Sequence, residues 1–282
     1  MTAPDPARVQ TDEPALFDAS ADLPASGPFV WHDLMSAEPA RSVAFYEALF
    51  GWTTEARHVG SAGSYTYIQA GAHPFGGVVP LDPRFGVPAH WVSYVCVDDV
   101  DGTCARAAAA GGKTCIPPTD IPNVGRFAMI EDPFGAVLAP ISLPERPGVA
   151  ADVPPPPGTA WWHELASPDP IRAAAFYRAV FGWRVQEAAF LDGSVYWLFL
   201  RRGTPTAGML HAPPGASSRP HWRVYVAVDD VDATVARAIA LGASPSFPCR
   251  EVPGVGRVGG FVDPTGAVLA VGQSRDGVMG DA

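Results

Sequence analysis

The spacing of hydrophobic and polar residues changes along the chain in a regular order. Residues 29–35, FVWHDLM, alternate and are rich in large side chains, which predicts a strand. Apolar side chains then recur at helical spacing through residues 36–52, and Gly51 predicts the end of a helix. Residues 64–70 and 75–81 again have the composition of strands. This order predicts a small α+β unit.

The same order starts again at residues 90–97, HWVSYVCV. A second helix is expected next, with Asp98 or Asp99 as its N-cap and Gly111 as its C-cap. Residues 126–141 then predict two strands joined by the turn EDPFG.

The two halves of the chain are related by a constant offset. AFYEALFGW at residues 44–52 recurs as AFYRAVFGW at residues 175–183, so that each position in the first half corresponds to one 131 residues later. A constant offset indicates a duplication without net insertions. Four consecutive prolines in the seam between the halves favour an extended spacer.

These observations predict a division into two tandem domains. The expected boundaries are a polar tail at 1–27, a first domain at 28–145, a Pro-rich linker at 146–158, a second domain at 159–275 and a tail at 276–282. The Phe–Tyr pair of each repeated peptide is expected to anchor its helix in the core.

Composition narrows the function classes. Of the 282 residues, 48% are hydrophobic and 17% are charged, which predicts well-filled cores. A net charge of -10 argues against a nucleic-acid partner. Because no apolar run has membrane-spanning length, no secretory h-region is seen and none of the four cysteines forms a CxxC pair, we expect a cytoplasmic protein with no membrane partner.

Three repeated motifs resemble the vicinal oxygen chelate superfamily. They are FYxxxFGW after the first strand of each half, VDDVD after a later strand, and DPxG at residues 132–135 and 263–266. Members of this superfamily include glyoxalase I, extradiol dioxygenases, and fosfomycin and bleomycin resistance proteins, and the chain is most similar to tandem two-domain, glyoxalase-like members. The resemblance covers nearly the whole chain outside the tails and linker. It implies four βαβββ modules that form two domains, each a cupped mixed sheet with flanking helices; we call the concave faces the N-terminal cup and the C-terminal cup. It also implies a small-molecule ligand, and because four modules already complete both cups within one chain, we expect a monomer or weak dimer.

The resemblance also maps the metal-ligand positions of the family onto this sequence. They fall at Trp31 and Trp162, Val92 and Arg223, Ala139 and Ala270, with a further position near residues 76–78 and 207–209. None of these residues binds a metal ion well, so neither a metal nor another cofactor is expected. A register shift of one residue would place His32 and His163 at the site, which leaves a metal site as an alternative.

Strand alternation predicts which side chains line the cups. If Trp31 faces the cup, Asp33 and Met35 share that face, while Val30, His32 and Leu34 face the helix. Each cup is then expected to contain an aromatic wall (Trp31 or Trp162), a carboxylate (Asp33 or Glu164), an imidazole (His90 or His221) and a phenol (Tyr94 or Tyr225). A carboxylate and an imidazole can perform general acid–base catalysis, although each residue also fits a structural role.

Three functions fit this pattern. The first is a metal-independent lyase or isomerase that uses the carboxylates and imidazoles as acid and base. The second is a ligand-sequestering protein of the antibiotic-resistance kind, in which the tryptophans stack on a planar ligand. The third is a metal-dependent glyoxalase or dioxygenase.

The C-terminal cup is the expected functional site, because Arg223 replaces Val92 there and needs a partner such as Glu164. Two further arginines are expected to form ion pairs near the DPxG turns, Arg126 with Glu131 or Asp132 and Arg257 with Asp263.

Overall fold

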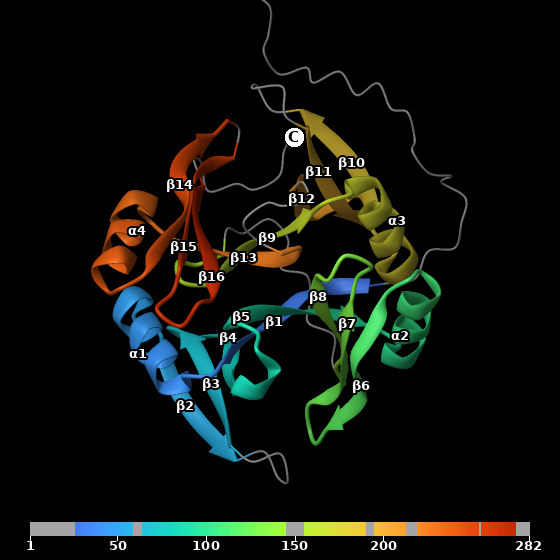
Figure 1. The fold of residues 1–282 in the computed structure, drawn as a ribbon, viewed down its shortest axis with the longest axis horizontal. Helices are drawn as coiled ribbons and strands as arrows, with labels where there is room; N and C mark the ends of the chain where they lie inside the picture. Colours follow the sequence, from blue (N-terminus) through green and yellow to red (C-terminus); the bar gives the residue numbers. More distant parts are fainter. Residues whose placement is uncertain are drawn as a thin grey trace, which may run out of the picture.

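The computed structural model describes residues 26–58, 64–144, 155–189, 195–212, 219–253 and 255–274. Residues 26 and 27, which we expected in the N-terminal tail, belong to the first strand, whereas the rest of the expected tails and most of the expected linker lie outside the described residues. Each half of the chain forms an eight-stranded mixed sheet with two flanking helices (Figure 1). This confirms the predicted α+β class.

The first half contains two modules that share one sheet. Its elements are β1 (Ser26–Ser36), α1 (Pro39–Phe50), β2 (Thr53–His58), β3 (Ser64–Ala70), β4 (His73–Pro80), the short 3₁₀ helix η2 (Pro83–Phe85), β5 (His90–Val97), α2 (Val100–Ala109), β6 (Lys113–Ile121), β7 (Gly125–Glu131) and β8 (Val137–Ser142). The strand order is β2-β3-β4-β1-β5-β8-β7-β6. β1 pairs with β4 and β5 with β8 in parallel, while β1 and β5 pair antiparallel and join the modules.

The second half repeats this plan. Its elements are β9 (Ala160–Ser167), α3 (Pro170–Phe181), β10 (Arg184–Ala189), β11 (Val195–Arg201), β12 (Thr204–His211), β13 (His221–Ala227), α4 (Val231–Ala240), β14 (Ser244–Val252), β15 (Gly256–Val262) and β16 (Val268–Ser274). The strand order β10-β11-β12-β9-β13-β16-β15-β14 is equivalent to that of the first half. Residues that are 131 positions apart in the sequence therefore lie in equivalent strands and helices of the two halves.

Helix ends follow the expected chemistry. Gly51, with φ 69°, and Gly182, with φ 72°, end α1 and α3 in the left-handed region that favours glycine. Asp99 caps α2 by accepting a hydrogen bond from the backbone of Gly102 at 2.9 Å. The C-cap of α2 is Ala110, one residue before the predicted Gly111.

The edge strands β2 and β6 were not located from the sequence. β6 reads KTCIPPTDI, is mostly exposed and forms one edge of its sheet. Proline is tolerated at an edge because no ladder hydrogen bond is needed on the free side. An exposed edge strand also lacks the hydrophobic alternation that marks a half-buried strand.

The two sheets lie back to back, and their helical flanks pack against each other. α1 lies beside α4, and α2 lies beside α3 (Figure 1). One buried cluster contains Phe45, Tyr46 and Leu49 from α1 together with Val235 from α4 and Phe261 from β15. A second cluster joins α2 and α3 in the same way. The repeated peptide therefore anchors the contact between the halves as well as its own sheet.

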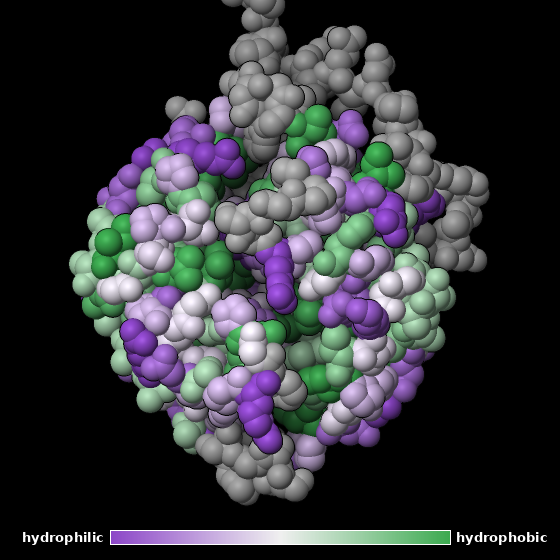
Figure 2. Space-filling model, in the orientation of Figure 1, coloured by the Kyte–Doolittle hydropathy of each residue, from purple (hydrophilic) through white to green (hydrophobic). Residues whose placement is uncertain are grey.

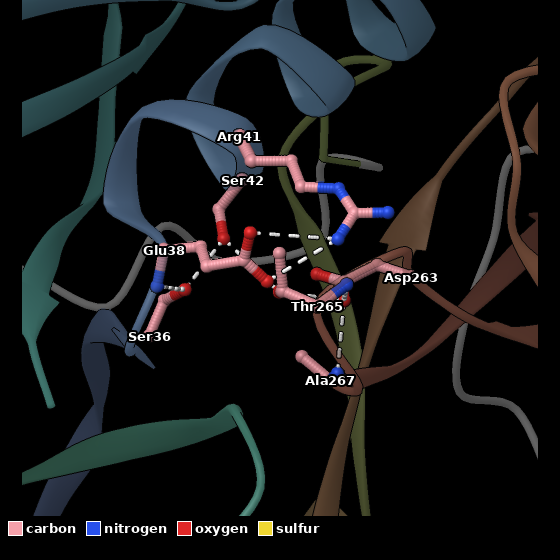
Figure 3. A network of polar contacts seen from close by, with 7 residues as sticks. All are labelled: Ser36, Glu38, Arg41, Ser42, Asp263, Thr265 and Ala267. Atoms are coloured by element: carbon pink, nitrogen blue, oxygen red, sulfur yellow. Dashed lines mark hydrogen bonds and ion pairs between the residues drawn. The ribbon is translucent and has the colours of Figure 1, made fainter. Parts of the chain in front are cut away.

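Each DPxG aspartate accepts a hydrogen bond from the other half. The Tyr46 hydroxyl donates to Oδ2 of Asp263 at 2.9 Å, and the Tyr177 hydroxyl donates to Oδ2 of Asp132 at 3.0 Å. Oδ1 of Asp263 meanwhile accepts from the backbone of Ala267 at 2.9 Å and fixes the turn (Figure 3). Both aspartates are buried.

The expected partners of Arg126 and Arg257 were wrong. Arg126 pairs with Asp101 of α2 at 2.7 Å and with Asp120 at 2.9 Å, and Arg257 pairs with Asp232 of α4. The reason is that the DPxG aspartates face the interior between the halves, where the exposed arginines do not reach.

Candidate functional site

The concave face of the first sheet is built from alternate residues of its central strands. Asp33 of β1 lies opposite Val92 of β5, and Tyr94 lies opposite Ala139 of β8. Val92, Tyr94 and Ala139 form one buried cluster, against which Trp31 and Met35 pack. In the lower half of Figure 2, hydrophobic side chains, coloured green, lie deeper than the more hydrophilic side chains around them.

Val30 departs from the predicted alternation. We expected it to face the helix, but it packs against the cup cluster beside Trp31. The register of β1 against β5 shifts between Phe29 and Trp31, and such a bulge puts two successive side chains on one face. His32 and Leu34, beyond the bulge, do face away from the cup.

Asp33 lies at the centre of the N-terminal cup. Its Oδ2 accepts a hydrogen bond from the Tyr94 hydroxyl at 2.7 Å, and its Oδ1 accepts from Trp31 Nε1 at 3.1 Å and from the Tyr65 hydroxyl. Burial raises the pKa of Asp33, and the three hydrogen bonds oppose that rise. Burial also raises the pKa of both tyrosines, so they stay protonated and donate.

Glu164 has the equivalent position in the C-terminal cup. Its Oε1 accepts from the Tyr225 hydroxyl at 2.9 Å and from Arg223 Nη1 at 3.0 Å, and its Oε2 accepts from the Tyr196 hydroxyl at 3.1 Å. Trp162 Nε1 donates to the Tyr196 oxygen at 3.0 Å. The side chains of the Arg223–Glu164 pair are only 13% and 7% exposed. Loss of either partner would therefore leave a buried charge without its counter-charge.

Tyr65 and Tyr196 belong to these networks, and the sequence analysis did not find them. They lie on β3 and β11, and their hydroxyl groups rest against Gly77 and Gly208. A Cβ atom on either glycine would collide with the hydroxyl oxygen. The sequence did contain a signal for them, because Tyr65 and Tyr196, like Gly77 and Gly208, are 131 residues apart and so are repeated in both halves.

The two predicted imidazoles do not touch the carboxylates. Nδ1 of His90 lies 2.9 Å from the carbonyl oxygen of Pro88, and among the described residues no hydrogen bond joins His90 to Asp33. Nδ1 of His221 lies 2.7 Å from the carbonyl oxygen of Arg219, and its Nε2 lies 3.3 Å from Nη2 of Arg223.

Arg223 therefore stands between the imidazole and the carboxylate of the C-terminal cup. A ring nitrogen that meets a carbonyl oxygen must carry the proton, so in the neutral ring the lone pair of His221 Nε2 accepts a hydrogen bond from Nη2 of Arg223. Burial, and then the charge of Arg223, lower the pKa of His221.

The residues of the cups do not fit the metal ion of the family. The mapped ligand positions contain Trp31, Val92 and Ala139, and the Tyr65 hydroxyl fills the space beside Gly77. Across the described ranges, no group of three or more His, Cys, Asp or Glu side chains could hold a metal ion.

The alternative register is not supported either. His32 and His163 lie on the opposite face of their sheets, with their Nε2 atoms 2.9 Å apart. They therefore face each other between the halves and not the cups.

No helix in the described part of the chain is long and apolar enough to cross a membrane.

Both halves match family profiles. Residues 29–139 match the Glyoxalase/Bleomycin resistance protein/Dioxygenase superfamily, and residues 162–271 match the family described as Glyoxalase-like domain. The "Putative glyoxylase CFP32" of Mycobacterium tuberculosis is 34% identical over 86% of this chain and 92% of that protein. The "Anthracycline biosynthesis protein DnrV" of Streptomyces peucetius is 34% identical over 90% of this chain and 95% of that protein.

Solved structures show the same fold at low identity. Homoprotocatechuate 2,3-dioxygenase from Arthrobacter globiformis has a TM-score of 0.61 and 17% identity, covering 90% of this chain and 82% of that one. The Mn(II)-bound glyoxalase from Novosphingobium aromaticivorans has a TM-score of 0.58 and 19% identity, covering 89% and 82%.

Proposed function

The chain belongs to the glyoxalase/bleomycin resistance protein/dioxygenase superfamily, and from this premise we propose that its C-terminal cup is the active site of a metal-independent small-molecule enzyme. The proposed chemistry is proton transfer of the lyase or isomerase type. Relatives named for a glyoxylase and for anthracycline biosynthesis support a small organic substrate.

The observation that supports this function most is the position of His221 beside Arg223. Its Nε2 lone pair accepts a long hydrogen bond from the guanidinium, at 3.3 Å, and a proton donor of the substrate would take the place of that bond. Burial and the charge of Arg223 lower the pKa of His221, which favours the neutral ring. A neutral imidazole can accept a proton from a substrate carbon or hydroxyl. Arg223 would stabilise the negative charge that then develops on a neighbouring substrate oxygen.

The remaining residues of the cup would position these two. Glu164 fixes the guanidinium, and Tyr225 and Tyr196 fix Glu164. Trp162, which is partly buried at the same cluster, would form an aromatic wall for the substrate.

We propose no proton transfer in the N-terminal cup. Trp31, Asp33, His90 and Tyr94 are the corresponding residues there, but Val92 stands in place of the cation. A developing oxygen charge would have no positive partner. We propose that this cup binds a ligand without converting it.

Hydrogen–deuterium exchange at an acidic carbon tests the proposal. Chelator-treated protein is mixed with phenylpyruvate in deuterated buffer, and loss of the C3 proton signal is followed by NMR. His221→Gln should slow the catalysed exchange by about 10²-fold or more, while His90→Gln should not change it. Catalysed exchange that persists in His221→Gln would contradict the assignment.

A ligand-sequestering protein is the second candidate. Phe247, which lies under the guanidinium of Arg223 at 4.9 Å, and Trp162 favour stacking on a planar ligand. Saturable binding of phenylpyruvate without exchange or product would favour this alternative.

We also propose a monomer or weak dimer in a reducing compartment such as the cytoplasm. Each described sheet is built from strands of one chain, and all four cysteines are free thiols.

A further inference from the structure

We infer that the ligand of the C-terminal cup carries a carboxylate, which the side-on edge of Arg223 binds through Nε and Nη2. The inference rests on the proposed function only in naming the same cup, because it concerns binding and not turnover. Three observations support it: Nε of Arg223 has no partner among the described residues, Phe247 and Gly260 pack around the guanidinium, and the N-terminal cup has Val92 in place of the arginine.

In the part of the chain that the structure describes, the guanidinium keeps one nitrogen without a partner. Nη1 donates to Glu164, Nη2 donates to His221, and the Tyr225 hydroxyl also interacts with the guanidinium. Nε is buried and has no hydrogen-bond partner within the described residues. Nε and the nearer hydrogen of Nη2 point in parallel from the side-on edge, a fork that matches the two oxygens of a carboxylate.

An unpaired buried N–H is costly and needs a reason. Leaving such a donor unsatisfied lowers the stability of the fold, and more so when the group is charged. Native proteins keep few such groups, and one in a binding cup indicates a donor reserved for a ligand. A lone carbonyl oxygen would satisfy only one arm of the fork, whereas a carboxylate satisfies both.

The C-terminal cup is shaped around this guanidinium. Phe247 lies beneath it, and Gly260 lets the ring approach, since a Cβ there would collide with the ring. The equivalent positions of the N-terminal cup are Ile116 and Met129, and both pack in the apolar cluster around Val92. The change from valine to arginine is thus accompanied by changes at the neighbouring positions that make room for it.

The charges of the cup leave the fork free to bind a second anion. Glu164 shares its charge among Arg223, Tyr225 and Tyr196, and it contacts Nη1, away from Nε. A ligand carboxylate on the side-on edge would face a guanidinium that is stacked on Phe247 and protected from water.

Fluorine NMR with a matched pair of probes tests the inference. The probes are 4-fluorobenzoate and its neutral isostere 4-fluorobenzamide, titrated to millimolar concentration. We expect wild-type protein to bind the benzoate at least about tenfold more tightly than the amide. Arg223→Lys, which keeps the charge but removes the fork, should weaken benzoate binding by about tenfold, whereas Val92→Ala should not change it.

Each outcome decides the inference. Equal binding of the two probes, no binding of benzoate to the wild type, or full benzoate affinity in folded Arg223→Lys would overturn it. The probe comparison on wild-type protein needs no variant to fold. Carboxylate-dependent binding with no proton exchange would overturn the proposed function alone, and exchange without carboxylate preference would overturn this inference alone.

Discussion

Nε2 of His32 lies 2.9 Å from Nε2 of His163, where the first strands of the two halves meet. Nδ1 of His32 lies 3.1 Å from the carbonyl oxygen of Phe75 and so carries a proton, which leaves its Nε2 to accept from His163. The ring of His163 stacks on Phe29 at 3.6 Å. The bond requires Nε2 of His32 to stay unprotonated, and two charged rings could not form it.

Stability should therefore fall in mild acid. Burial lowers the pKa of His32 to about 4, and burial together with His32 lowers that of His163 well below its usual value. The unfolded chain, with histidine pKa values near 6.5, binds more protons between pH 6.5 and 4. The free energy of unfolding should thus decrease on acidification by about 1.4 kcal/mol per pH unit for each histidine.

Urea denaturation at several pH values measures this slope. His163→Gln should reduce this slope by roughly the contribution of one histidine, and Tyr67→Phe, which removes no histidine, should retain it. A slope unchanged by His163→Gln would show that the pair does not titrate as a buried unit.

A second prediction concerns the hydrogen bonds that cross between the halves. Tyr46→Phe removes the donor to buried Asp263 and also the acceptor of Trp91 Nε1, which lies 3.2 Å from the hydroxyl. The free energy of unfolding should fall by about 1–3 kcal/mol. Tyr67→Phe, on the partly exposed face of the N-terminal cup, should change it by less than about 0.5 kcal/mol.

A double-mutant cycle separates the bond from other effects. Tyr46→Phe and Asp263→Asn should be strongly non-additive, whereas Tyr46→Phe and Asp132→Asn should be close to additive. Additivity in both cycles would mean that the contact between Tyr46 and Asp263 contributes nothing measurable.

The sequence could not show which half each tyrosine would meet. Asp132 and Asp263 occupy equivalent positions of a duplicated motif, so the pattern around Tyr46 fits either aspartate. The choice depends on packing between helices far apart in the chain. By contrast, alternation along a strand is local, and it placed Asp33 and Glu164 in the cups from sequence alone.

The residues that were missed share another physical cause. Tyr65 and Tyr196 contact the carboxylates from two strands away, across β4 and β12, and only strand order and register bring them there. The bulge beside Val30 likewise has no marker in the alternation of β1. Periodicity thus predicts faces, while contacts across the sheet require pairing information that the pattern does not contain.

A third prediction tests the room left by glycine at the floor of the C-terminal cup. Gly208→Ala should displace the Tyr196 ring, remove a donor from Glu164 and lower the free energy of unfolding by about 1–3 kcal/mol. Gly208→Ala combined with Tyr196→Ala removes the collision, so adding the glycine change to Tyr196→Ala should cost less than about 0.5 kcal/mol. Equal effects of Gly208→Ala in both backgrounds, measured by denaturation, would contradict this role.

The last prediction moves the arginine site into the other cup. Val92→Arg alone should lower the free energy of unfolding by about 1–3 kcal/mol or more, because Met35 and Met129 occupy the surrounding space. Adding Met35→Ala and Met129→Gly copies the small residues of the second half, and Asp33→Glu restores the reach of Glu164. The combined variant should recover part of the lost stability, as measured by urea denaturation.

If the fork determines recognition, the same combined variant should also bind a second 4-fluorobenzoate. Tyr65 and Tyr94 can donate hydrogen bonds to the side chain introduced by Asp33→Glu, as Tyr196 and Tyr225 donate to Glu164. The stoichiometry from fluorine NMR should rise from one to two, and a matched variant with Val92→Lys in the same background should stay at one, because an ammonium has no planar fork. A folded arginine graft that still binds one equivalent would mean that Arg223 depends on features of the C-terminal cup beyond the carboxylate, the small residues and the guanidinium itself.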